Sequence, residues 1–142
     1  MTDILSYQHR LDTGTIIGGE PGETALIKLK EAGFTTLISL RGEGESPFGA
    51  SHFEAHGFKF THLPISGPGD FTPAFLTQFD TALSEAEGPT AVFCATGNRV
   101  GAAFALHANR INGLSAEDSL ALGIQAGLTR LAGFVQQQLT DD

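Results

Sequence analysis

The sequence predicts an α/β fold in which a mainly parallel central sheet is flanked by helices. Short β-branched and apolar segments, typical of buried strands, alternate with longer segments whose apolar residues recur at helical spacing. Gly, Pro and helix-capping residues stand between the two kinds of segment. Strands that alternate with helices form parallel sheets, because the chain must cross over a face of the sheet before the next strand begins.

The first half of the chain is expected to contain three strands and two helices. The apolar run at residues 15–18 ends in the turn sequence Gly18-Gly19-Glu20-Pro21. A helix from Glu23 to Gly33 has apolar residues on one face. The remaining segments are a buried strand at 35–40, a loop rich in Gly, Ser and Glu at 41–49, a short helix at 51–56 and a half-exposed strand at 58–63.

In the second half, a loop at residues 64–70 precedes Thr72-Pro73, an N-cap followed by proline at the first helical position. Phe75, Phe79 and Leu83 lie on the inward face of the helix that follows. Ser115, with acidic residues after it, begins another helix. The other expected segments are a strand at 90–93, a polar loop at 94–99, a nearly all-apolar helix at 100–111 and a final helix at 129–139.

Length and composition predict one domain spanning residues 1–142, with an ordinary globular composition. The net charge of −8 argues against a nucleic-acid partner, since phosphate backbones select basic surfaces. No apolar run approaches the roughly 20 residues of a membrane span, which argues against a membrane partner. The N-terminus lacks the pattern of a secretory signal, so a cytoplasmic location is expected.

The chain has a single cysteine, which excludes an internal disulfide and a CxxC motif. A lone cysteine is more often a small buried hydrophobic residue than a nucleophile. Cys94, however, lies between a predicted strand and a predicted buried helix, in the segment Cys94-Ala-Thr-Gly-Asn-Arg99. A loop that leads into a helix N-terminus presents free N–H groups and the positive end of the helix dipole, and such a field favours a reactive thiolate.

Gly97 allows this loop to bend and a ligand to approach its backbone. Arg99 can hold two oxygens of a tetrahedral oxyanion through its planar guanidinium. The residues therefore predict an anion site with a cysteine nucleophile at one end and an arginine at the other.

Four segments in register resemble a known family: Gly18-Gly-Glu-Pro21, Leu37-Ile-Ser-Leu-Arg41, His62-Leu-Pro-Ile65 and Cys94-Ala-Thr-Gly-Asn-Arg99. They are similar to the bacterial beta-lactamase-hydrolase-like phosphatases, a branch of the tyrosine and dual-specificity phosphatase superfamily. The segment Ala121-Leu-Gly-Ile-Gln-Ala-Gly127 resembles that family's C-terminal helical region. The resemblance implies a protein-tyrosine-phosphatase-like fold and hydrolysis of a phosphomonoester, on a small molecule or a phosphoprotein, with no metal and no organic cofactor.

The resemblance also implies roles for individual residues. Cys94 would form a phosphocysteine intermediate. The phosphate would be held by the Arg99 guanidinium and by the loop amides of Ala95, Thr96, Gly97, Asn98 and Arg99. Asp70 is the only carboxylate in residues 64–72, where the superfamily usually carries its general acid, and a turn-capping role explains its position equally well.

Three departures from the superfamily pattern keep two other functions open. The loop has four residues between Cys94 and Arg99 where the common phosphatase loop has five, and four is typical of many rhodanese-type sulfurtransferases. Phe93 replaces the usual His, and Val100 replaces the usual Ser or Thr. These two replacements favour a non-catalytic module that binds phosphoanions.

Other polar residues allow two interpretations each. His52 and His56 could share a metal, but without a third ligand an exposed helix explains them better. Glu43 and Glu45 could line the rim of the anion site or belong to a solvated acidic loop. Arg41, at the end of a predicted strand, could add positive charge to the site or pair with Glu43.

Overall fold

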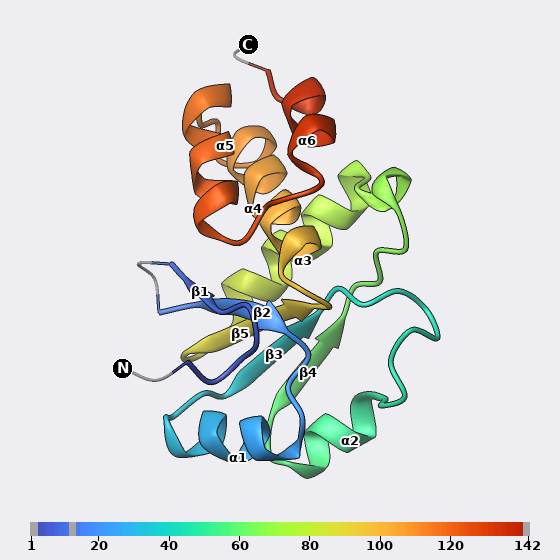
Figure 1. The fold of residues 1–142 in the computed structure, drawn as a ribbon, viewed down its shortest axis with the longest axis vertical. Helices are drawn as coiled ribbons and strands as arrows, with labels where there is room; N and C mark the ends of the chain where they lie inside the picture. The colour runs from blue at the N-terminus through green and yellow to red at the C-terminus, as the bar shows by residue number, and fades with distance from the viewer. Residues whose placement is uncertain (1–2, 12–13, 141–142) are drawn as a thin grey trace.

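The computed structural model describes residues 3–11 and 14–140, in which a five-stranded sheet lies between two layers of helices (Figure 1). The strand order is β1-β2-β5-β3-β4; β1 is antiparallel to β2, and the other neighbours are parallel. Helices α1 and α2 cover one face of the sheet, and α3 to α6 cover the other. The predicted α/β fold with a mainly parallel sheet flanked by helices is confirmed.

The observed elements follow the predicted order. The strands are β1 (His9–Arg10), β2 (Ile16–Gly19), β3 (Thr36–Ser39), β4 (Lys59–His62) and β5 (Thr90–Cys94). The helices are α1 (Glu23–Glu31), α2 (Ala50–Ala55), the 3-10 helix η1 (Pro68–Asp70), α3 (Pro73–Glu85), α4 (Asn98–Arg110), α5 (Ala116–Gln125) and α6 (Ala132–Gln138). Both predicted caps are confirmed: Thr72 accepts a hydrogen bond from the Phe75 amide, and Ser115 from the Asp118 amide.

The central strand β5 is buried along its whole length. Its side chains alternate between the two faces of the sheet, as strand geometry requires. Ala91 and Phe93 belong to the hydrophobic core under α1 and α2, whereas Val92 and Cys94 belong to the larger core under α3 to α6. The Cys94 side chain therefore lies on the α4 side of the sheet, at its carboxyl edge.

Helix α4 is buried from Val100 to Asn109, as its apolar composition predicts. Small residues let neighbouring segments approach it closely. A Cβ atom at Gly101 would clash with the backbone of Leu128, and a Cβ atom at Gly123 would lie 2.7 Å from the Cβ of Ala105. The segment from α5 to α6 is thus packed tightly against the helix that follows the Cys94 loop.

Three features differ from the sequence-based expectations. Helix α4 begins at Asn98 rather than at residue 100, so Asn98 and Arg99 form its first turn. The loop at 64–70 contains the 3-10 helix η1. Strand β1 was not expected, because a two-residue strand has too few residues to show a period.

Candidate functional site

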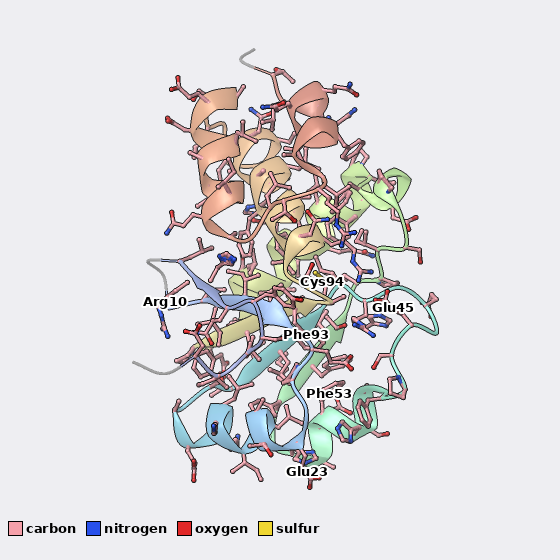
Figure 2. All side chains as sticks on the ribbon, viewed as in Figure 1. Arg10, Glu23, Glu45, Phe53, Phe93 and Cys94 are labelled. Atoms are coloured by element: carbon pink, nitrogen blue, oxygen red, sulfur yellow. The ribbon has the colours of Figure 1, made fainter. Side chains whose placement is uncertain are left out.

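Strand β5 carries Cys94 to the carboxyl edge of the parallel sheet, where the chain turns into α4. In parallel α/β sheets, this edge is where ligands bind. Cys94 lies between the sheet and the first turn of α4 (Figure 2). Its side chain is 1% exposed, and the amide of Gly97 donates a hydrogen bond to its sulfur at 3.1 Å.

The loop between Cys94 and α4 leaves backbone donors open. Gly97 has a φ of 89°, a left-handed conformation that glycine adopts without the steric penalty of a Cβ. Among the described residues, no backbone carbonyl accepts a hydrogen bond from the amides of Ala95 or Thr96. The amides of the first helical turn, from Asn98 onward, are also unpaired in any α-helix. The loop therefore offers several N–H groups at the positive end of α4.

Arg99 is held by two residues from other parts of the chain. Its Nη1 donates to Glu45 Oε1 at 2.7 Å and to the Ile65 carbonyl at 2.8 Å, and its Nη2 donates to Glu45 Oε2 at 2.8 Å. A guanidinium has five N–H donors in a fixed plane. These three bonds leave Nε–H and the second Nη2–H, which lie side by side and form a two-pronged grip for an oxyanion.

Glu45 is the residue that fixes this arrangement. Its carboxylate also accepts from the Gly42 amide at 2.8 Å, and Arg41 Nε lies 3.2 Å from its Oε2. The hydrogen bonds from Arg99 lower the pKa of Glu45 from 4.5 to about 2, although burial acts in the opposite direction. In return, the Glu45 carboxylate raises the pKa of Arg99, and the nearby Cys94 sulfur adds to that rise.

Asp70 ends η1 in the loop that also contains Ile65, the backbone acceptor of Arg99. Its Oδ2 accepts hydrogen bonds from the amides of Ser66 at 2.8 Å and Gly67 at 3.2 Å. Asp70 therefore caps the turn at residues 66–67, one of the two roles considered for it from the sequence. Both contacts are to Oδ2, and within the described chain no hydrogen bond reaches Oδ1.

Asn98 contributes to the loop in a different way. Its side-chain Oδ1 accepts hydrogen bonds from the amides of Thr129 and Leu131, at 3.0 and 3.1 Å. Its side-chain oxygen thus ties the first turn of α4 to the segment after α5. The two residues that replace the usual His and hydroxyl residues of the superfamily, Phe93 and Val100, are both fully buried.

A cavity of about 250 Å³ opens beside the site, at the carboxyl ends of β2, β3 and β4. It is lined by residues of the loop from Gly42 to Gly49 and by Glu20, Ser39, Phe53, Phe60 and His62. Arg41 does not pair with Glu43; it pairs with Glu45, and its Nε lies 4.0 Å from Glu20 Oε1. Glu45 joins this cavity to the Cys94 loop, because the same carboxylate contacts Gly42 and Arg99.

The His52–His56 pair shows no metal-site geometry. His56 Nδ1 lies 2.9 Å from the carbonyl of His52, and the His52 ring stacks on Phe48 with centroids 4.1 Å apart. Within residues 3–11 and 14–140, no group of three potential His, Cys, Asp or Glu ligands comes together. Nor does any helix in this part of the chain have the length and apolar character needed to cross a membrane.

The sequence alone did not show whether Glu45 belongs to the anion site or to a solvated loop. Its contact with Arg99 joins residues 54 positions apart, and no local pattern reveals such a pair. The sequence indicated only that Glu45 lies in a loop after the end of a strand, and Glu43 lies in the same loop. Glu20 was seen only as part of a turn, although it directly follows Gly19, the β2 residue paired with Cys94.

Comparison with known proteins gives a consistent result. Residues 22–110 match the family described as the phosphatase-like domain of beta-lactamase hydrolase-like proteins. A beta-lactamase hydrolase-like protein of Agrobacterium fabrum is 30% identical over 96 residues, which are 63% of this chain. The match covers 22% of that longer relative.

Several solved phosphatase structures share the fold. Tk-PTP in its active form has a TM-score of 0.70 at 19% identity, over 94% of this chain and 95% of its own. TpbA of P. aeruginosa, in complex with phosphotyrosine, has a TM-score of 0.70 at 15% identity, over 98% and 88%. The PP-IP phosphatase of S. cerevisiae, in complex with citrate, has a TM-score of 0.69 at 14% identity, over 100% and 90%. These likenesses confirm the protein-tyrosine-phosphatase-like fold.

Proposed function

The chain belongs to the family of phosphatase-like domains of beta-lactamase hydrolase-like proteins, and we propose that it hydrolyses phosphomonoesters through a phosphocysteine intermediate on Cys94. The observation that carries the proposal is the geometry of the loop. Open amides and the Nε–Nη2 edge of Arg99 surround the end of β5, where the Cys94 sulfur accepts a hydrogen bond from Gly97 and interacts with the Arg99 guanidinium. A phosphate held there has its phosphorus beside the nucleophile.

The reaction has two steps. In the first, the Cys94 thiolate attacks phosphorus; the S–P bond forms, the ester P–O bond breaks, and the leaving oxygen takes a proton from a general acid. In the second, water attacks phosphorus and gives a proton to the same carboxylate, and the S–P bond breaks to return the thiolate and free phosphate. The loop amides and Arg99 hold the equatorial oxygens in both steps.

We assign the general acid to Asp70. Its loop also supplies the Ile65 carbonyl to Arg99, so the two residues belong to one connected structure. The amides of Ser66 and Gly67 hold Oδ2, which orients the carboxyl group and leaves Oδ1 to carry the proton. A carboxyl that only caps the turn would show the same two bonds, and mutation separates the two roles.

The substrate in this proposal is a phosphorylated small molecule or phosphoprotein, in the cytoplasm. TpbA was solved in complex with phosphotyrosine, and the S. cerevisiae neighbour is named a PP-IP phosphatase; both support a phosphorylated substrate. No metal or organic cofactor enters the proposed steps.

The test is release of inorganic phosphate from an aryl phosphate by the wild-type chain and by Cys94→Ser. Wild-type turnover that is lost in the variant supports the proposal. Serine is close to cysteine in size and its hydroxyl is a weak nucleophile, so the variant should lose turnover and still bind phosphate. Equal inactivity of both proteins on every phosphoester would refute the proposal.

The loop length favours a second function, a sulfurtransferase with Cys94 as the persulfide carrier. Four residues separate Cys94 from Arg99, as in many rhodanese-type enzymes. Thiocyanate formation from thiosulfate and cyanide, measured in parallel, tests this function. If neither activity is found and phosphate still binds, the buried Phe93 and Val100 point to a module that binds phosphoanions without turnover.

A further inference from the structure

The cavity of about 250 Å³ opens at the same carboxyl edge of the sheet as the Cys94 loop. Its walls include Glu20, which follows β2, and Ser39, which ends β3. β5 lies between these two strands, with Gly19 paired to Cys94 and Ser39 paired to Phe93. The cavity therefore spans the tip of the strand that carries the nucleophile, on the α2 side of the sheet.

Aromatic rings form much of the cavity wall. Phe53 stacks on Phe60 with ring centroids 4.6 Å apart and meets Phe48 edge-on at 6.4 Å. Phe53 is 1% exposed and packs against both of the other rings. Phe60 is half-buried and Phe48 is 42% exposed, so both can contact a ligand. Aromatic faces of this kind attract cations, and clusters of them bind quaternary ammonium groups.

The charged residues of the wall are acidic. Glu20 and Glu43 line the cavity, and no Lys or Arg of the described chain does so. The Glu20 side chain is only 12% exposed, and its Oε1 is buried with no hydrogen-bond partner among the described residues. The nearest cation, Arg41 Nε, lies 4.0 Å away and is shared with Glu45. A buried carboxylate oxygen without a hydrogen bond is costly, so a second positive group against this wall would stabilise it beyond what Arg41 provides.

We propose that this cavity binds a positively charged leaving group, so that the preferred substrates are phosphomonoesters of ammonium-bearing alcohols. This inference rests on the proposed phosphatase function and names its substrate class. A bound phosphate adds negative charge beside Glu20, Glu43 and Glu45, and an ammonium group on the same substrate offsets it. A leaving group with further phosphates would place more negative charge against the two cavity carboxylates and is disfavoured.

Two matched probes test the proposal: phosphocholine and its neutral isostere, in which carbon replaces the quaternary nitrogen. Their dissociation constants are measured by calorimetry on the Cys94→Ser variant, which binds without turnover. We expect phosphocholine to bind about tenfold more tightly, the order of magnitude of a partly desolvated cation–aromatic contact. Adding Glu43→Gln should reduce the preference to about threefold or less. Adding Glu54→Gln, on α2 but outside the cavity wall, removes the same charge and should leave the preference intact.

Each outcome decides the matter. Equal affinity for the two probes overturns the inference, and so does a preference that Glu43→Gln and Glu54→Gln reduce equally, since the effect would then be one of overall charge. If the wild-type chain releases phosphate from an aryl phosphate and neither probe binds, the proposed function stands and the substrate class is wrong. If aryl phosphate is not hydrolysed while phosphocholine still binds preferentially, the cavity assignment stands and the phosphatase proposal fails.

Discussion

Replacing Glu45 by Gln should destabilise the protein by about 1–2 kcal/mol at pH 7. A pKa lowered from 4.5 to about 2 corresponds to at most about 3 kcal/mol of stabilisation of the charged carboxylate in the folded state. The Glu45 side chain is 32% exposed, so solvent screening reduces that figure to the expected range. Gln keeps the size of the side chain but presents an amide N–H group where Arg99 needs an acceptor.

The loss should depend on pH in a defined direction. Because the folded-state pKa of Glu45 lies below the unfolded value, its contribution is fully present above about pH 4.5 and is lost as the pH falls toward 2. The difference between wild type and Glu45→Gln should therefore stay constant from pH 7 to 5 and shrink between pH 4 and 3.

Urea unfolding at pH 7, 5, 4 and 3 measures this difference. Glu43→Gln is the matched control: it removes a carboxylate from the same loop, and no ion pair of the described residues involves Glu43. Its effect at pH 7 should stay within about 0.5 kcal/mol. If both variants have equal stability at pH 7, or if the Glu45 difference persists undiminished at pH 3, the Arg99–Glu45 pair does not stabilise the site as argued.

Three further substitutions test the site. Arg99→Lys should lose both turnover and most of the affinity for inorganic phosphate. The lysine ammonium is not planar and cannot make bidentate hydrogen bonds to Glu45 and to an oxyanion at the same time. Phosphate affinity retained in calorimetry would contradict this. Asp70→Asn should slow hydrolysis of esters with poor leaving groups by roughly 10²–10⁴-fold and slow hydrolysis of esters with good leaving groups much less. An equal effect on both kinds of ester, or no effect, would mean that Asp70 only caps the turn. Gly97→Ala should cost about 1–2 kcal/mol in urea unfolding and weaken phosphate binding, since φ is 89° at this position. Gly133→Ala, within α6 and with open space around the added methyl, should be neutral or stabilising.

The fold was largely predictable because its signals are local. Apolar periodicity, Thr72-Pro73 and Ser115 placed the main helices, and the helix after Cys94 was recognised by its apolar composition. Its start was predicted two residues too late, because Asn98 and Arg99 are polar and resemble loop residues in sequence. Gly97 explains the difference: its left-handed conformation turns the chain so that the helix begins at the next residue.

The site was predictable only in part, for a related reason. Cys94 and Arg99 belong to one short segment, so their strand–loop–helix context identified them together. Glu45 reaches Arg99 from a loop whose path depends on tertiary packing, and sequence alone could not choose between Glu43 and Glu45. The buried, unpartnered oxygen of Glu20 is likewise a property of the assembled edge of the sheet and has no signature in the chain.

The hydrogen bonds from Thr129 and Leu131 to Asn98 give the C-terminal helices a part in the architecture of the loop. The family match ends at residue 110, before either of these donors. A shorter protein that ended there would keep Cys94, Arg99 and Glu45. The first turn of α4 would lose the two hydrogen bonds that Asn98 accepts, and Gly101 would lose its close packing against Leu128. The family match thus covers the reactive groups, whereas some residues that hold their geometry lie past its end. Any exchange of this loop between relatives has to carry the segment around residues 123–131 with it.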